Sequence, residues 1–291
     1  MFGDLTRVGA NFHAMEAWSN LKRVNGDIGQ IQSRLSTGKR INSSEDDTSG
    51  YALSKHLESR ARGLSQALDN VGTAKNVLNI AEGGYQSQMS ILQTMKEKAT
   101  QAADDSWSTE QRGGINDQFD ALALELTDIS NDTTFNDKAL FGSTTTFHVG
   151  EGSGDTLAVS LSGSNANVVV NDGDDWVSGG IGEDHTDISG VDLSGTDGTN
   201  ARAAISTLDS AIKSLSKSIQ KVGDYNARLS SKEESLSLAI SNTEATRSRI
   251  EDADFAKEQM GMMKLQILQQ TSVSSFSQAN SAPQMVLSLL R

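Results

Sequence analysis

The sequence predicts a mainly α-helical protein in which long helices from both chain ends pair as antiparallel coiled coils, with a small β-hairpin and loop region in the middle. Three observations lead to this fold class. Apolar residues recur at coiled-coil spacings in both halves of the chain. The 291 residues include a single proline and only 5% aromatic residues, which suits long packed helices better than a compact globule. The middle of the chain is instead rich in glycine and acidic residues.

Four helical runs follow from the apolar periodicity. The first two contain Leu21, Val24, Ile28, Ile31 and Leu35, and then Leu64, Val71, Leu78, Tyr85, Leu92 and Ala99. The third run spans 115–129 and the fourth spans 208–250. A helix over 57–101 is about 68 Å long at ~1.5 Å per residue, which is the length of a rod.

Turn-forming and cap-forming residues separate these runs. The stretch 42–47 reads Asn-Ser-Ser-Glu-Asp-Asp and is expected to break the first run from the second. Ser106 or Ser108 is expected to cap the third helix, with Glu110 or Gln111 near the third helical position.

The segment 143–200 has a different character, with eleven glycines. Alternating residues at 145–149 and 156–161 predict two strands, and 150–155 predicts the turn between them. Residues 168–170 are a possible further short strand. The segment holds few apolar groups, so it is expected to pack on the helices rather than form its own core.

Charge is concentrated in the same segment. It carries ten acidic residues and no lysine or arginine, out of a net charge of -13 for the chain. The remaining 28 acidic and 25 basic residues nearly cancel. This distribution argues against a nucleic-acid partner, because binding phosphates requires a basic surface.

The pattern divides the chain into three parts. Residues 1–42 with 250–291 are expected to form a terminal helical domain. Residues 43–161 with 200–249 are expected to form a helical rod domain that carries the hairpin. Residues 162–199 are left as a short acidic loop region facing solvent.

No motif for catalysis or cofactor binding is present. The four histidines are scattered, and there is no nucleophile elbow, P-loop or dinucleotide-binding pattern, so we expect neither an enzyme nor a cofactor. The absence of cysteine excludes disulfides and thiolate metal sites. Residues 179–184 match only the opening of the calcium-binding nonapeptide repeat, without tandem copies, so a plain acidic loop is the preferred interpretation.

The sequence also lacks the patterns of a membrane or Sec-exported protein. No stretch approaches the roughly 18 apolar residues of a membrane span. The first five residues do not begin a basic and then apolar signal peptide. If the protein works outside the cell, we expect it to leave by a route that reads no Sec signal.

Met260, Met262 and Met263 cluster near the C-terminus. They have two interpretations, as part of a helix core or as an adaptable surface for a changing partner. The core is favoured, because apolar helical stripes usually indicate packing.

Several longer sequence motifs lie in the two halves of the chain. Residues 35–43 read Leu-Ser-Thr-Gly-Lys-Arg-Ile-Asn-Ser, and Glu-Asp-Asp follows at 45–47. Residues 248–256 read Ser-Arg-Ile-Glu-Asp-Ala-Asp-Phe-Ala, and 280–290 read Asn-Ser-Ala-Pro-Gln-Met-Val-Leu-Ser-Leu-Leu. These motifs resemble those of bacterial flagellins and occur in the family's order, and the resemblance covers about residues 1–160 and 200–291. The motif residues are Arg34, Leu35, Gly38, Arg40, Asn42, Asp46, Asp47, Arg249, Asp252, Asp254, Phe255, Asn280 and Pro283.

The resemblance implies a structural subunit that polymerises into the extracellular flagellar filament for motility. It implies that the two chain ends line the filament's inner tube, while the rod domain and hairpin form an outer tube. It also implies that residues 162–199 are too few for a full outer domain. It further implies export of the unfolded chain through the flagellar type III apparatus. The implied partners are copies of the chain itself, alone or mixed with other flagellins, and export-chaperone, junction and cap proteins.

The two ends are therefore expected to carry the assembly contacts. An amphipathic end helix cannot bury its apolar stripe alone, so order and assembly should be coupled. Residues 1–40 and 250–291 are expected to be mobile in the monomer and ordered in the filament. The residues assigned to filament-core assembly are Leu21, Ile28, Leu35, Ile267, Leu268, Val286, Leu287 and Leu290.

Many flagellins are sensed by an innate immune receptor through a helix that aligns with 92–101. The sensed pattern resembles L-Q-R-x-R-E-L-A-x-Q, in which the final Gln corresponds to Gln101. Here Thr94 replaces the first Arg and Lys98 replaces the Leu. Losing an arginine anchor and placing a charge on an apolar contact should weaken such binding.

Two other classes of protein share parts of this pattern. A hook–filament junction protein has similar terminal helices, although the motif at 280–290 favours a flagellin. A cytoplasmic coiled-coil scaffold would form a stable dimer rather than a concentration-dependent polymer, and it leaves the matched ends unexplained.

Overall fold

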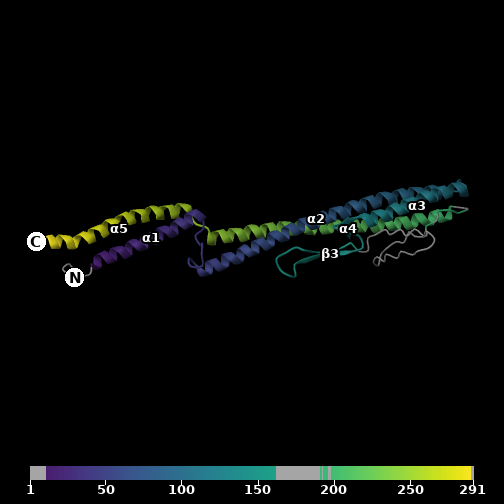
Figure 1. The fold of residues 1–291 in the computed structure, drawn as a ribbon. Coiled ribbons are helices and arrows are strands. Elements are labelled where there is room, and N and C mark those ends of the chain that lie inside the picture. The colour runs from purple at the N-terminus through teal and green to yellow at the C-terminus, as the bar shows by residue number, and fades with distance from the viewer. Residues whose placement is uncertain (1–10, 162–190, 192, 196–197, 290–291) are drawn as a thin grey trace. The chain divides into compact units, whose positions relative to one another are not determined.

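The computed structural model describes residues 11–161, 191, 193–195 and 198–289, without the side chains of 282–289. It confirms the predicted mainly helical fold (Figure 1). The helices are α1 (Phe12–Thr37), α2 (Thr48–Ala102), α3 (Thr109–Asp132), α4 (Thr199–Glu251) and α5 (Phe255–Leu289).

The strands form two small antiparallel pairs. The predicted hairpin is present as β3 (Thr144–His148) and β4 (Thr156–Ser160). A shorter pair, β1 (Thr134–Phe135) and β2 (Lys138–Ala139), was not predicted. Its turn consists of two residues in the left-handed region, Asn136 with φ 51° and Asp137 with φ 61°. Both residue types tolerate that conformation and so suit a two-residue hairpin turn.

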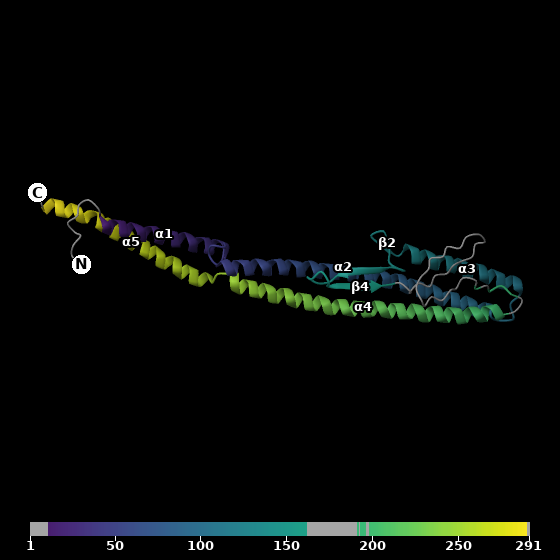
Figure 2. The ribbon, with the colours of Figure 1, turned by 90° about the horizontal axis from the view of Figure 1, so that it is seen from below.

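The chain divides into two compact units, which we call the terminal unit (1–61 with 241–291) and the bundle unit (62–240). In the terminal unit, α1 and α5 lie side by side in both views (Figures 1 and 2). They run antiparallel, because the Asn11 side-chain amide donates to the Ala279 carbonyl at 2.7 Å and the Gln269 amide donates to Asn25 at 2.7 Å.

The bundle unit has its core between α2, α3 and α4. Lys75 pairs with Glu233 at 2.8 Å and Lys96 pairs with Asp209, so α2 and α4 run antiparallel. The stripe of α2 that faces the core follows the predicted seven-residue repeat and is fully buried. It consists of Leu64, Ala67, Val71, Ala74, Leu78, Ala81, Tyr85, Gln88, Leu92, Met95, Ala99 and Ala102.

The hairpin packs on this bundle as predicted. Leu157 and Val159 on β4 are buried in the same core. The Asn70 amide of α2 donates to the His148 carbonyl at 3.1 Å, and the backbone N–H of Ser160 donates to the Tyr225 hydroxyl of α4 at 3.5 Å. The strands thus gain from the helices the support that an isolated hairpin lacks.

Polar contacts close the end of the bundle where α2 turns into α3. Ser108 caps α3 and forms the predicted capping box with Gln111. The Arg112 side chain is only 1% exposed. Its guanidinium donates to the carbonyls of Ala102 at 3.0 Å and Asp104 at 3.1 Å, so the buried charge fixes the loop between the two helices.

Several predictions fall outside the described residues: most of the acidic loop region, the possible strand at 168–170 and the calcium-like segment at 179–184. Among the residues that the structure does describe, no group of His, Asp and Glu is placed to hold a metal ion. Within that same part of the chain, no helix is long and apolar enough to cross a membrane.

Candidate assembly interface

One face of α1 packs against α5 with a seven-residue repeat. Ala14 and Val24 are buried, and Leu21, Ile28 and Leu35 continue the stripe as half-buried residues. The facing stripe on α5 is also half-buried and consists of Gly261, Leu265, Gln269, Ser272, Phe276 and Ala279. The pair therefore has a coiled-coil seam that two helices alone cover only in part.

Small and aromatic residues set the spacing of this helix pair. A Cβ atom on Gly261 would lie 3.1 Å from Cδ1 of Ile31, so glycine at this position permits the close approach of α1 and α5. Near the other end of the pair, the rings of Trp18 and Phe276 lie 5.8 Å apart and tilted. Trp18 nevertheless remains 56% exposed, so this contact does not bury it.

A second apolar stripe lies on the opposite face of α5. Met260, Met263 and Ile267 are 61%, 51% and 65% exposed, and they fall at helical spacings of three and four. The expectation that Met260 and Met263 belong to a helix core is therefore wrong for the single chain. A helix that is apolar on two faces needs a partner on both, and α1 covers only one.

The N-terminal part of α1 adds to the exposed apolar surface. Phe12 and Met15 are 54% and 66% exposed on the side of α1 turned away from α5. Between the two helices lies a groove of about 340 Å³, lined by the apolar Ala17 and Leu268 and by the polar His13 among others. The described part of the helix pair thus offers both apolar ridges and a groove.

The residues assigned to assembly from the sequence divide between these surfaces. Leu21, Ile28 and Leu35 face α5, while Ile267 and Leu268 are exposed. Val286 and Leu287 lie on α5, but their side chains are outside what the structure describes, and Leu290 is wholly outside it.

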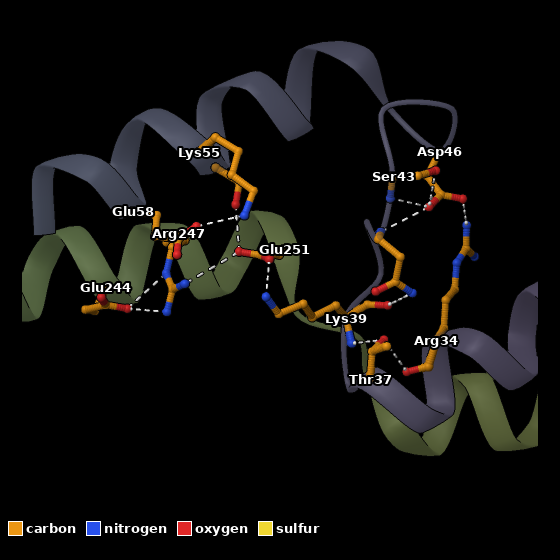
Figure 3. A network of polar contacts seen from close by, with 12 residues as sticks. Arg34, Thr37, Lys39, Ser43, Asp46, Lys55, Glu58, Glu244, Arg247 and Glu251 are labelled. Carbon is orange, nitrogen blue, oxygen red and sulfur yellow. Dashed lines mark hydrogen bonds and ion pairs between the residues drawn. The ribbon is translucent and has the colours of Figure 1, made fainter. Parts of the chain in front are cut away.

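The breaks that end α1 and α4 meet in the terminal unit (Figure 3). Gly38 ends α1 with φ 71°, a left-handed conformation that favours glycine. The backbone N–H of Arg40 donates to the Glu251 carbonyl at 2.6 Å, and the N–H of Ala253 donates to the Gly38 carbonyl at 2.9 Å. The Arg40 guanidinium also donates to the Ile250 carbonyl at 2.7 Å, so the two turns are bonded directly.

The Glu251 carboxylate lies at the centre of this junction and is 5% exposed as a residue. It accepts a hydrogen bond from the Ser54 hydroxyl of α2 at 2.6 Å and pairs with Lys39, while Arg247 lies 3.8 Å away (Figure 3). Burial raises the pKa of this carboxyl, but the bonds from Lys39 and Ser54 outweigh burial and hold the pKa below its usual value.

A second carboxylate organises the connector between α1 and α2. Asp46 accepts hydrogen bonds from the Gln30 amide at 2.8 Å and from the backbone N–H groups of Asn42 and Ser43 at 3.0 and 3.1 Å. These bonds, led by the one from Gln30, lower the pKa of Asp46. Arg34 lies between Asp46 at 3.8 Å and Glu258 of α5 at 3.7 Å, so it joins the connector to both terminal helices.

Two further aspartates begin helices at the same junction. Asp47 accepts from the N–H groups of Ser49 and Gly50 at the start of α2, and Asp254 accepts from Ala256 at the start of α5. A Cβ atom on Gly50 would lie 2.4 Å from the Asp47 carboxylate, so this cap requires glycine there. The motifs from the two chain ends therefore build a single structural joint.

The comparisons with known proteins agree with this architecture. Residues 8–146 match the family described as the bacterial flagellin N-terminal helical region, and 205–290 match the bacterial flagellin C-terminal helical region. The chain belongs to the bacterial flagellin family.

Relatives in the flagellin family match over nearly their whole length. A flagellin of Halalkalibacterium halodurans is 33% identical over 285 residues, covering 97% of this chain and 98% of the relative. A flagellin of Listeria monocytogenes is 32% identical over 291 residues, covering 98% and 99%. The crystal structure of Bacillus cereus flagellin aligns with a TM-score of 0.39 at 21% identity, over 60% of this chain and 88% of that one.

Most of the flagellin motif residues lie at the joint, but a few lie elsewhere. Arg249 and Phe255 are exposed beside it, and Asn280 is exposed near the end of α5. The side chain of Pro283 is outside the described residues. Asp252 sits in the bridge between the two turns, opposite Lys39.

Three residues of the joint were not singled out from the sequence. Gln30, Ser54 and Glu251 all bind across the joint, at separations of 16 residues for Gln30–Asp46 and 197 for Ser54–Glu251. Local patterns do not reveal such partners. Glu251 does stand within the flagellin motif at 248–256, which was the available signal.

The helix equivalent to the receptor-sensed segment of flagellins lies in the bundle unit, on α2. The Thr94 hydroxyl donates to the Ser90 carbonyl at 3.0 Å within its own helix. Lys98 is half-buried and Gln101 is exposed. None of the three belongs to the α1–α5 pair.

Proposed function

We propose that this chain is a structural subunit that polymerises with copies of itself into the extracellular flagellar filament, and that it is not an enzyme. The observation that carries the proposal is the second apolar face of α5, formed by Met260, Met263 and Ile267. Because these side chains are 51–65% exposed, burying the rest of one of them stabilises an interface by about 1–2 kcal/mol, and three of them together supply a strong drive to associate.

The joint supplies what such a subunit needs besides an apolar face. Bonds from Arg40 to Glu251 and from Ala253 to Gly38 hold the end of α1 and the start of α5 together. The joint therefore keeps α1 and α5 together as a pair, although the seam between them is only half-buried. We infer that neighbouring subunits complete the burial, with the chain ends lining the inside of the filament.

A charge on the outer face of α5 tests this proposal. Ile267→Asp should leave the helix content of the monomer unchanged, because the side chain is 65% exposed. It should raise the critical concentration for polymerisation at least about 10-fold, the factor that ~1.4 kcal/mol produces. The matched control is Gln266→Asp, at the next position and also exposed, which adds the same charge beside the stripe.

Sedimentation and electron microscopy measure the polymerisation of both variants. Normal filaments from Ile267→Asp at ordinary concentrations would contradict the proposal. So would equal losses in both variants, since charge alone would then explain them. From the flagellin motif at 280–290 we also assign Val286, Leu287 and Leu290 to assembly, and Leu287→Asp should stop polymerisation while the long helices stay folded.

We infer the other binding partners and the export route from membership of the flagellin family. We propose contacts with an export chaperone and with junction and cap proteins, and export of the unfolded chain through the flagellar type III apparatus without a Sec signal. Deleting the export apparatus of the host should keep the chain inside the cell. Secretion that continues in its absence would contradict this route.

We also propose that an innate immune receptor senses this chain weakly. Thr94 directs its hydroxyl to the backbone of its own helix, and Lys98 places an ammonium where the sensed pattern has leucine. Thr94→Arg with Lys98→Leu should therefore strengthen the response of reporter cells. A parent response as strong as that of a matching flagellin would overturn the proposal.

A further inference from the structure

The seam between α2 and α4 repeats almost without change every seven residues. On α2, small residues recur at Ala67, Ala74 and Ala81, and on α4 they recur at Ala204 and Ala211. Large residues alternate with them on both helices, at positions such as Leu64, Val71 and Leu78 on α2 and Leu208, Leu215, Val222 and Leu229 on α4. If one helix slid by seven residues, or about 10 Å, each small residue would face the same kind of residue as in the native register.

A polar residue interrupts each series of small residues. After Ala81 the next position on α2 is Gln88, which is 0% exposed, and after Ala211 the next on α4 is Ser218, which is 3% exposed. The side-chain oxygen and nitrogen of Gln88 have no hydrogen-bond partner. Within residues 62–102, the part of α2 in the bundle unit, which the structure describes throughout, Gln88 is the single buried polar residue.

These interruptions fall at the same level of the bundle. The ion pairs Lys75–Glu233 and Lys96–Asp209 lie on either side and place Gln88 opposite Ser218 in the antiparallel register. On α3, Ser130 is also buried. It comes one turn before Thr133, whose hydroxyl would be 2.8 Å from a Cβ atom on Gly84, one turn before Gln88.

We propose that Gln88, Ser130 and Ser218 form a polar layer that fixes the register of α2 against α4 in the bundle unit. A slip of seven residues would place Gln88 opposite Ala211 or Tyr225, and Ser218 opposite Ala81 or Met95. The Ser218 hydroxyl donates to the Ser214 carbonyl at 3.1 Å in its own helix and would keep that bond after a slip. The Gln88 amide would instead lose the serines at its level and lie beside Ala211 or beside the ring of Tyr225. A buried polar residue at a single core position is a known way to specify register at a cost in stability.

The absence of cysteine makes the register measurable by spin labelling of the full chain. Asn79→Cys on α2 and Ser206→Cys on α4 are exposed sites staggered along the bundle unit. Nitroxide labels there report the slip by double electron–electron resonance, because seven residues change their axial separation by about 10 Å. The parent chain should show one principal distance.

Two substitutions remove the polar residue in different ways. Gln88→Ala extends the alanine series of 67, 74 and 81, and Gln88→Leu fills the same space with an apolar side chain. Both should add a second distance displaced by about 10 Å, the length of seven helical residues. The matched control is Met95→Ala, at the next position of the same series, which removes a large side chain but leaves the polar layer intact.

The control should keep a single distance while its thermal midpoint falls. A single, parent-like distance in both Gln88 variants would overturn the proposal. A second distance in Met95→Ala equal to that in the Gln88 variants would also overturn it, because lost packing rather than lost polarity would then set the register.

Discussion

The bundle unit and the terminal unit are built from the same kind of apolar repeat, but they bury it to different extents. Leu78, Leu92 and Leu208 in the bundle are 0% exposed. In the terminal unit, Leu21 and Ile28 stay half-buried, and Ile267 is 65% exposed. Three helices and a hairpin close the first core, whereas two helices leave the second open. The repeat therefore indicates that a helix needs partners, and the number of partners within the chain decides whether it also needs another subunit.

The largest expected effect on the free energy of unfolding comes from shortening one apolar side chain in each unit. Leu92→Ala should reduce the free energy of unfolding by about 2–5 kcal/mol, because it leaves a cavity in a closed core. Ile28→Ala, in the half-open seam, should cost the dilute monomer under about 1.5 kcal/mol. Urea unfolding followed by circular dichroism measures both. Equal losses would break the comparison, because the terminal pair would then be as complete as the bundle.

The closed end of the bundle offers the next test. Arg112→Met keeps most of the side-chain length but leaves the carbonyls of Ala102 and Asp104 without their donor. The expected loss of unfolding free energy is about 2–4 kcal/mol. Arg228→Met, an exposed guanidinium 5.7 Å from the Tyr225 ring, should cost less than about 1 kcal/mol. A smaller loss at Arg112 than at Arg228 would show that the buried charge does not organise that end.

The joint of the terminal unit should depend on pH through Glu251. Its folded pKa lies below the ordinary value of 4.5, so the stabilisation is present above 4.5 and is lost as pH falls through the folded pKa. The amides of Arg40 and Ile41 donate to the Glu251 carbonyl and report the joint locally. Their hydrogen-exchange protection, corrected for intrinsic rates, should fall below pH 4.5 in the parent.

Glu251→Gln provides the control for this titration. It should lower the protection of the same amides at neutral pH, because Lys39 and Arg247 lose their shared carboxylate. It should also abolish most of the loss on acidification. An unchanged pH dependence in the variant would assign the effect to another group at the joint, such as Asp46.

The smallest expected effect concerns the cap of α3 in the bundle. Ser108→Ala removes the hydroxyl that accepts from the Gln111 N–H at 3.3 Å and should cost about 1 kcal/mol. Gln111→Ala removes only the reciprocal bond, in which the Ser108 N–H donates to the Gln111 side chain at 3.0 Å, and should cost less. Thermal unfolding of the two variants compares them, and a larger loss for Gln111→Ala would reverse the assignment of the cap.

Much of the fold was predictable because it depends on the spacing of residues that are close together in the sequence. The seven-residue step from Leu64 to Ala99 gave the buried seam of α2, and Ser108 with Gln111 marked the start of α3. The alternation around Val159 gave the hairpin. Each of these signals arises from residues close together in the chain, where periodicity and capping chemistry act directly.

The features that were missed depend on partners far away in the chain or outside it. In the sequence, Arg112 looks like an ordinary surface charge. Only the structure shows that it is buried and bonded to the backbone carbonyls of Ala102 and Asp104. Ser54 and Glu251 meet across 197 residues, which no local pattern reports. Met260 was assigned to a core, but whether an apolar face is inside or outside depends on how many helices are available to cover it.

Hydrogen exchange of the same protein as dilute monomer and as filament tests the central contrast most directly. Peptides from α5 around Met260 to Phe276 should exchange rapidly in the monomer and become strongly protected in the filament, because only neighbouring subunits cover their second face. Peptides from α2 around Leu78 to Leu92 should be protected equally in both states. Strong protection of α5 in the dilute monomer, unchanged on polymerisation, would contradict the account.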